Sequence, residues 1–405
     1  SLHDALPIYE AMGYAPVITT KGGLLVQLAK GCEGNGGVLV ETHTDTLGGM
    51  VAEVKGNGRL RLTALGGMNP NNAETENCVV ITRDGKRYEG CFQMNNPSIH
   101  VNGSYDQQDR TYDNMEVVLD EMVFSKEETK ALGIETGDIV CFETRTRITE
   151  KGYIKSRFLD DKLSVAILLG YAKYLKEENV TPSRPVYQHI TVYEEVGHGG
   201  SASVPEGVTD ILSVDMGCVG DGLECKEHQV SICVKDSGGP YSYDFTGELI
   251  AAAKANGIDY AADVYPHYGS DVEATLRGGA DARHALIGAG VYASHGYERS
   301  HVDGVKNTLE LLAAYLDVTA ADVPPEVPYL RVLACNERGR KLLKTIKKTG
   351  SAPVLTKSAD VRALSEEAQK LFALTARAAD QYVLAYPELR AARGSGAWTE
   401  GPVIV

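Results

Sequence analysis

The sequence lacks any hydrophobic run long enough to cross a membrane. Its apolar stretches, such as Val165 to Leu169, are far shorter than the roughly 20 residues that a membrane-spanning helix needs. The N-terminal residues also lack the basic and apolar segments that mark a secretory signal peptide. With 43% hydrophobic and 23% charged residues, the composition is that of an ordinary soluble globular protein. We therefore expect a cytoplasmic protein with no membrane partner.

Closely spaced cysteine pairs and an excess of positive charge are missing as well. The eight cysteines are scattered without a CxxC pair, which argues against a zinc ribbon and fits reduced thiols. The formal net charge of −15 disfavours nucleic acid as the main partner. This negative charge lies in the first 320 residues, because residues 321–405 carry 13 basic against 9 acidic side chains.

The chain of 405 residues is long enough for two or three domains, and its texture changes along its length. Short alternating strands and glycine turns between residues 51 and 152 interrupt a pattern of strands and helices. Three prolines in Asp322 to Pro328 predict a linker, because proline continues neither a helix nor a central strand. We predict an α/β fold with a mixed sheet and helices on both faces, divided as follows: a discontinuous catalytic domain at 1–50 and 153–320, an inserted β-rich domain at 51–152, a linker at 321–328 and a C-terminal α/β module at 329–405.

Two adjacent carboxylates follow a predicted strand in the stretch ITVYEEVGHGG, residues 190–200. Open α/β sheets place their chemistry at such strand ends. Glu194 and Glu195 repel one another, so the pair suggests a bound cation or a proton transfer. The alternative is a solvated corner between strand and loop, which is common for acidic pairs.

A histidine and an aspartate follow the short β run at Val38 to Glu41, as His43-Thr44-Asp45. The two-residue period of a strand places His43 and Asp45 on one face, about 7 Å apart along the chain. They suggest a metal-bound imidazole supported by a carboxylate. The alternative is a buried structural histidine beside an acid.

Three further candidates lie at predicted strand or helix ends. Asp160 precedes a helical pattern, where it serves either as a helix cap or as a carboxylate that bridges two cations with its two oxygens. Asp215 ends the buried run at Ile211 to Val214. His301 lies just before the helix predicted at Val305 to Leu316, with His295 as a competitor for the same role.

Together these residues form a set that suits two divalent cations. Two imidazoles and three carboxylates allow one histidine and one acid on each cation, with Asp160 bridging. The predicted ligands are His43, Asp160, Glu195, Asp215 and His301.

The motifs that carry these residues resemble those of the tetrahedral aminopeptidases, which include glutamyl aminopeptidases and members once labelled endoglucanases. The resemblance covers roughly residues 10–320, and the matching segments are HTD at 43–45, FLDDK at 158–162, YEEVG at 193–197, SVDMG at 213–217 and SHVDG at 300–304. Two departures stand out. Lys162 stands where arginine is usual, and Ser1 to Pro7 shows no clear pattern, so the helix expected before the first strand is missing or cut short.

The resemblance implies both a fold and a reaction. It implies a zinc-peptidase-like sheet and an aminopeptidase in which two divalent ions per subunit, zinc, cobalt or manganese, activate water for attack on peptides. It also implies that Glu194 is the general base, that Glu195 is a metal ligand and that Asp45 orients His43. The inserted domain is implied to mediate dimerisation within a tetrahedral dodecamer.

The C-terminal segment carries a second, unrelated resemblance. The stretch PYLRVLACNERGRKLLKTIKK at 328–348 is similar to the C-terminal region of bacterial tRNA(Met) cytidine acetate ligase. The nucleotide-binding part of that ligase is absent, so no ligase activity is expected. The basic helix predicted here is either a solvated face or a residual RNA contact. The two resemblances predict a fused or chimeric chain.

Three other functions compete with peptide hydrolysis. A glycosidase needs two carboxylates set roughly 5–9.5 Å apart across a sugar. The histidines would have no role in that reaction. A non-catalytic binding protein on this scaffold would be free to lose Glu194 or a ligand, and all of them are present. A metal-dependent deacylase of small amides would use the same residues.

Overall fold

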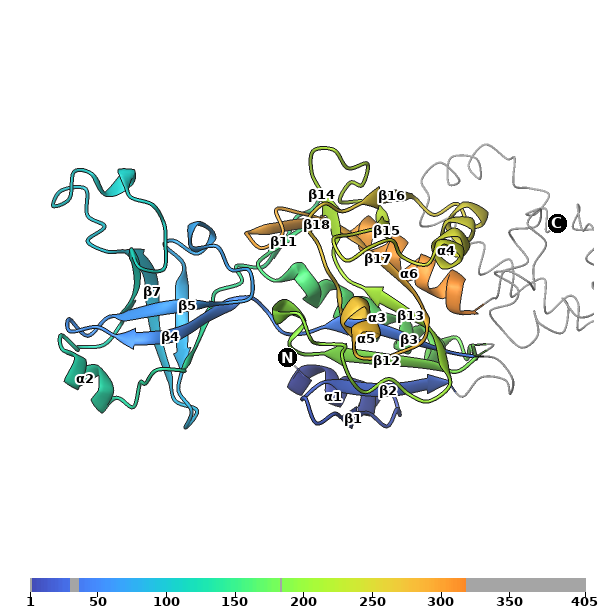
Figure 1. Ribbon diagram of the computed structural model, residues 1–405, viewed down its shortest axis with the longest axis horizontal. Coiled ribbons are helices and arrows are strands. Elements are labelled where there is room, and N and C mark those ends of the chain that lie inside the picture. The colour runs from blue at the N-terminus through green and yellow to red at the C-terminus, as the bar shows by residue number, and fades with distance from the viewer. Residues whose placement is uncertain (1, 30–35, 183, 318–405) are drawn as a thin grey trace, which may run out of the picture.

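The computed structural model describes residues 2–29, 36–182 and 184–317, and Figure 1 shows two bodies in this part of the chain. One is built on a large sheet, and the other is a small barrel that stands beside it. The predicted linker at 321–328 and the module at 329–405, with the basic helix predicted there, lie outside the described residues.

The large sheet has 12 strands and mixed strand directions. Its four central strands run parallel, and antiparallel strands flank them on both sides. This confirms the predicted mixed sheet. The main path runs in the order β1 (Val17–Ile18), β2 (Leu24–Ala29), β12 (Val186–Thr191), β3 (Gly37–His43), β13 (Val208–Val214), β17 (Arg283–Tyr292), β18 (Glu298–His301), β11 (Tyr153–Ser156) and β10 (Arg147–Ile148). Beside β17 lie β14 (Gly217–Val219), β15 (Val230–Lys235) and, paired with β15, β16 (Tyr260–Val264).

Helices cover both faces of this sheet, as predicted. On one face α3 (Leu159–Glu177), α4 (Tyr243–Ala255) and α6 (Val302–Asp317) pack together over the central strands. On the other face α5 (Asp271–Arg277) contacts β3, β13 and β17. Successive residues of β3 point to opposite faces of the sheet. Val38 and Val40 belong to the core under α3, whereas Leu39 belongs to the core that contains Val272 of α5. Burial on both faces explains the consecutive apolar residues Val38, Leu39 and Val40 in β3.

The inserted β-rich segment forms a closed barrel between β3 and β11. Its strands follow the order β4 (Gly48–Val54), β5 (Leu60–Leu65), β8 (Met115–Leu119), β7 (Arg87–Met94), β6 (Asn77–Ile81) and β9 (Ile139–Phe142). Short helical elements lie in its connections, namely η1 (Pro70–Asn72), η2 (Tyr105–Gln107) and α2 (Lys126–Ala131). The barrel has its own buried core, which includes Leu62, Phe92 and Val117. The barrel core is therefore separate from the core clusters of the larger body.

A helix is present before the first strand, which corrects the expectation that it is missing. Helix α1 spans Leu2–Ala11 and contains Pro7, whose ring and missing N–H disfavour a helix interior. Packing outweighs this penalty, because Ala5 and Tyr9 are buried against the sheet and α3. The Tyr9 hydroxyl also donates a hydrogen bond of 2.7 Å to Gln188 Oε1. Among the described residues, no helix combines the length and the apolar character needed to cross a bilayer.

Candidate metal centre

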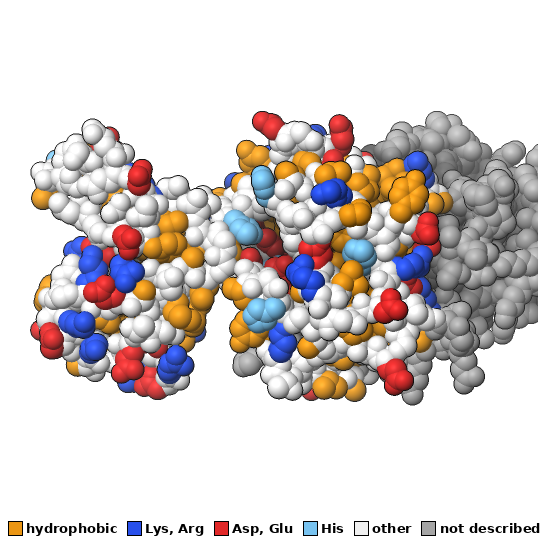
Figure 2. All heavy atoms as spheres, in the orientation of Figure 1, with side chains coloured by type: hydrophobic (Ala, Val, Ile, Leu, Met, Phe, Trp, Pro, Cys, Tyr) orange, Lys and Arg blue, Asp and Glu red, His pale blue; other side chains and the backbone are white. Residues whose placement is uncertain are grey.

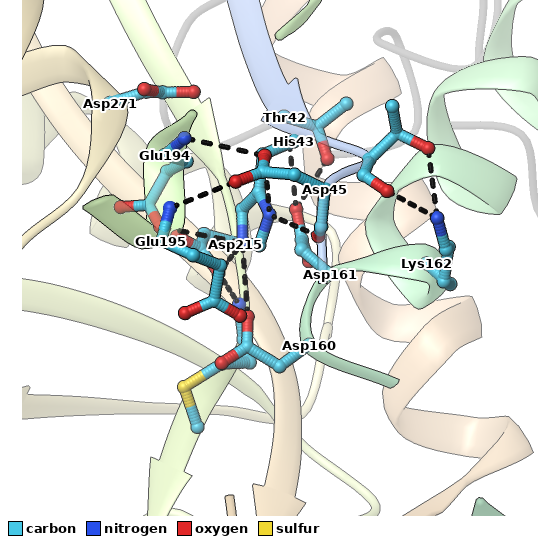
Figure 3. A network of polar contacts seen from close by, with 12 residues as sticks. Thr42, His43, Asp45, Asp160, Asp161, Lys162, Glu194, Glu195, Asp215 and Asp271 are labelled. Carbon is cyan, nitrogen blue, oxygen red and sulfur yellow. Dashed lines mark hydrogen bonds and ion pairs between the residues drawn. The ribbon is translucent and has the colours of Figure 1, made fainter. Parts of the chain in front are cut away.

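Polar side chains meet where the parallel strands of the large sheet end (Figure 3). His43 is the last residue of β3, and the pair Glu194 and Glu195 follows β12, which lies next to β3. Asp215 follows β13 directly, while Asp160 lies at the start of α3. The carboxyl ends of parallel strands share one edge of a sheet, which explains why residues far apart in sequence converge here. In Figure 2 acidic and histidine side chains gather in the recess where the barrel meets the larger body.

His43 is buried and held in one orientation. Its Nδ1 lies 3.1 Å from the main-chain oxygen of Asp45, a contact in which the ring N–H donates. Its Nε2 then faces the acids, 3.1 Å from Asp160 Oδ1 and 3.9 Å from Asp215 Oδ1. Burial lowers the pKa of His43, but the acids around it outweigh burial and raise the pKa well above its usual value. With Nδ1 occupied, Nε2 is the atom available to a cation.

Asp45 connects His43 to the acidic pair. Its two carboxylate oxygens accept the main-chain N–H groups of Glu194 at 3.3 Å and Glu195 at 3.2 Å. The turn that presents these N–H groups begins at Tyr193, which has a left-handed φ of 73°. The sequence predicted that Asp45 orients His43; in the structure the main-chain oxygen makes the closer contact, and the carboxylate lies 3.5 Å from Nδ1. Asp45 thus fixes both the imidazole and the acidic pair.

Asp160 lies between two imidazoles. Its Oδ1 is 3.1 Å from His43 Nε2, and its Oδ2 is 3.4 Å from His295 Nε2. Its main-chain N–H donates to Glu298 Oε2 at 3.1 Å. Burial raises the pKa of the Asp160 carboxyl, but the contacts with His295 and His43 outweigh burial and lower it overall. A carboxylate that stays ionised and offers one oxygen to each side can bridge two cations.

The second imidazole of this arrangement belongs to His295. His295 lies in the turn after β17, and its Nε2 is 3.7 Å from Glu195 Oε2. Its main-chain N–H donates to Glu298 Oε1 at 3.0 Å, so Glu298 holds both His295 and Asp160. The hydrogen bond to Asp160 raises the pKa of His295 to about 9.

His301, the ligand chosen from the sequence, does not reach this cluster. It ends β18, where its Nε2 lies 2.7 Å from the main-chain oxygen of Lys151 and its ring packs edge-on against Tyr153. Its Nδ1 accepts the main-chain N–H of Asp303 at 3.1 Å. Both ring nitrogens are therefore engaged away from the acidic cluster, and His295 rather than His301 lies beside Asp160.

Asp161 is a site residue that the sequence analysis did not single out. It is buried, and its Oδ2 accepts a hydrogen bond from the hydroxyl of Thr42. Its Oδ1 has no hydrogen-bond partner among the described residues. Leaving a buried carboxylate oxygen without a partner is costly, so this atom fits a site that receives a cation. The two adjacent aspartates in FLDDK are the feature of the sequence that could have identified Asp161.

The crowding of acids is electrostatically unfavourable without a neutralising positive charge. Burial, followed by the charge of Asp160, raises the pKa of Glu195 to about 8 and that of Asp215 to about 7. His43 offers a ligand atom within 4.8 Å of atoms of Asp161 and Asp215, and likewise of Asp160 and Glu195. A cation would relieve the repulsion, and protons would compete with it for the same oxygens. The donor set of imidazoles and carboxylates therefore fits divalent metal ions.

Comparison with known families places the chain among the peptidases. The family model of the M42 glutamyl aminopeptidases matches residues 22–311, and the chain belongs to this family. A second family model, that of the HIGH nucleotidyl transferases, matches residues 306–396. The second match agrees with the ligase resemblance of the C-terminal segment and with its fusion to an unrelated enzyme.

Several known proteins are similar to this chain. The protein YhfE of Bacillus subtilis (strain 168) is 42% identical over 296 residues, which cover 73% of this chain and 85% of YhfE. The glutamyl aminopeptidase of Lactococcus lactis subsp. cremoris (strain MG1363) is 27% identical over 193 residues, covering 47% of this chain and 53% of that protein. Among solved structures, a TET aminopeptidase from a marine sediment Thaumarchaeota archaeon has a TM-score of 0.71 at 18% identity, covering 78% of this chain and 89% of the other. At that identity the likeness shows the fold alone.

Proposed function

We propose that this chain is an aminopeptidase that removes N-terminal residues from peptides with the help of two divalent cations, zinc, cobalt or manganese. One observation carries the proposal: the Asp160 carboxylate lies between the imidazoles of His43 and His295, one oxygen toward each. A carboxylate that only capped the helix would not need a histidine on either side. The proposal applies to this chain the activity of its family.

The residues divide into two half-sites that share Asp160. Asp215 lies on the His43 side, and Glu195 lies on the His295 side. One cation would be held by His43 and Asp215, the other by His295 and Glu195, with Asp160 between them. When bound, such a pair of cations lowers the pKa of a water molecule and polarises a peptide carbonyl.

Glu194 is the residue placed to move the proton. Its Oε2 lies 3.7 Å from His43 Nε2, while its main chain is held by Asp45. Burial, opposed in part by His43, raises the pKa of the Glu194 carboxyl well above its ordinary value. A carboxylate with a raised pKa is a stronger base, so Glu194 would accept a proton from water and pass it to the leaving amine. A deacylase of small amides would use Glu194 in the same way. The two activities therefore differ only in the substrate that is hydrolysed.

Metal analysis tests the proposal directly. After reconstitution with zinc, cobalt or manganese, the purified full chain is expected to hold close to two ions, because the half-sites share one bridging acid. A chelator should remove the ions together with activity on an aminoacyl anilide, and added metal should restore both. Hydrolysis of N-acyl amides in place of aminoacyl anilides would favour the deacylase. Protein that binds no divalent ion after reconstitution would contradict the proposal.

We further propose that the chain forms a homo-oligomer through its barrel, which supplies no residue to the two half-sites. Two of the similar solved structures are described as a dodecamer and as a peptidase that assembles into a tetrahedron or an octahedral shell. A closed shell would admit peptides and exclude folded proteins. Light scattering on the full chain is expected to give a dimer or a multiple of it, up to the dodecamer, and a strict monomer would contradict this role of the barrel.

A further inference from the structure

His295 lies in the turn between β17 and β18, outside any helix or strand. After β17 ends at Tyr292, both Ala293 and His295 adopt left-handed backbone conformations, with φ of 58° and 61°. This conformation is unfavourable for residues with a side chain and persists when surrounding contacts maintain it. The His295 side chain is 41% exposed, whereas that of His43 is 1% exposed. The second imidazole of the site therefore depends on contacts from elsewhere.

Besides Glu298, these contacts come from the loop between β5 and β6, residues 66–76, which we name the barrel loop. The side-chain amide of Asn72 donates a hydrogen bond of 3.0 Å to the main-chain oxygen of His295. Gly67 lies against the imidazole itself, because a Cβ there would be 2.8 Å from His295 Nδ1 and 3.1 Å from its Cε1. Gly66 is equally close to the neighbouring ligand, since a Cβ there would be 3.1 Å from Glu195 Cβ.

Charged groups fasten the end of the barrel loop to the segment after His295. Glu76, whose side chain is 7% exposed, pairs with Arg145 at 2.6 Å and with Arg157 at 3.1 Å. The guanidinium of Arg145 lies 4.4 Å from the centre of the Tyr297 ring, and the Tyr297 hydroxyl donates to the main-chain oxygen of Arg145 at 2.8 Å. Arg157 is only 3% exposed, so its ion pair with Glu76 holds its geometry better than an exposed pair, whereas Arg145 is 46% exposed. The barrel loop therefore contacts His295 itself and is linked, through Arg145, to Tyr297 two residues beyond it.

We propose that the barrel contributes to the metal centre. Its loop positions His295 and thereby sets the affinity for a cation of the half-site that contains His295 and Glu195. The inference rests on the proposed function, because it takes His295 as a ligand. Gly67 and Asn72 are positioning residues, since they act through the histidine. The barrel thus has a role inside a single subunit as well as between subunits, and a shift of the barrel relative to the sheet would alter one half-site and spare the other.

Two matched pairs of substitutions separate this role from general stability. Gly67→Ala places a methyl group against the His295 ring, and among the described residues the ring supplies the only atoms within 4 Å of that methyl beyond the adjacent residues. Its control is Gly56→Ala, also in the barrel, where a Cβ meets nothing within 4 Å. Asn72→Ala removes the hydrogen bond to His295, and its control is the exposed neighbour Asn71, replaced by alanine.

The metal-free full chain and each variant are titrated with cobalt, and the amount of bound metal is measured at equilibrium. The melting temperature of each metal-free variant is measured as well. Gly67→Ala is expected to weaken one of the two sites by roughly 10–100-fold, the usual effect of disturbing groups that orient a ligand, and Asn72→Ala to weaken the same site less. The other site, the controls and the melting temperatures should match the unsubstituted chain.

The possible failures are distinct. If the unsubstituted chain binds two cobalt ions and every variant binds them with the same affinity, this inference is overturned and the proposed function stays intact. An unsubstituted chain that binds no cobalt would overturn both. If Gly67→Ala does not fold, Asn72→Ala against Asn71→Ala decides the question by the same criterion.

Discussion

Replacing Glu194 with glutamine is expected to lower kcat by roughly 10²–10⁴-fold, the usual contribution of a general base, while both metal ions stay bound. Glutamine keeps the size of the side chain but cannot accept a proton. The hydrogen bond that holds this residue in place runs from its main-chain N–H to Asp45, so the substitution should leave the turn intact. Steady-state kinetics and metal analysis on the same preparation provide the test.

Glu195→Gln is the matched control, because the two residues are neighbours and both donate their main-chain N–H to Asp45. Glu195 Oε2 lies beside His295 Nε2, so its loss should weaken metal binding first and activity as a consequence. If Glu194→Gln loses metal and Glu195→Gln keeps it, the roles of base and ligand within the pair are reversed.

Replacing His295 with alanine is expected to weaken one of the two metal sites by more than about 100-fold, since a direct ligand contributes more than the groups that orient it. The His43 half-site should keep its ion, because His43, Asp160 and Asp215 remain in place. The measurement is the number of ions retained after dialysis against a weak chelator, with peptidase activity recorded in parallel.

His301→Ala is the control for this substitution and tests the correction made by the structure. His301 contacts Lys151, Tyr153 and Asp303 rather than the acidic cluster, so both metal sites should keep their affinity. A loss of metal in His301→Ala with full retention in His295→Ala would restore the assignment made from the sequence.

The strand ends of this protein could be found from its sequence, because they are local features. An apolar run followed by a polar residue marks the end of a buried strand, and the carboxyl ends of parallel strands share one edge. These features mark His43, Glu195 and Asp215, and the structure brings them together. Asp160 is marked by the helical pattern that follows it.

The choice between His295 and His301 depended on where one strand ends. Strand β17 continues to Tyr292, and a short strand, β18, follows. With β17 ending at Tyr292, His295 is the histidine in the turn beyond its carboxyl end, and His301 lies in the next strand. Strand ends are set by pairing with neighbours, here β13, β15 and β18, and so by residues distant in sequence.

The sequence by itself determined the class of fold, the presence of a β-rich insertion and most of the acids of the site, since each follows from composition and short-range periodicity. Only the tertiary structure decided which histidine completes the set, that Asp45 anchors the acidic pair, and that the barrel touches His295. The last contact joins Asn72 to a residue 223 positions away. No local pattern encodes such a contact, because it depends on how the barrel and the larger body are placed against each other.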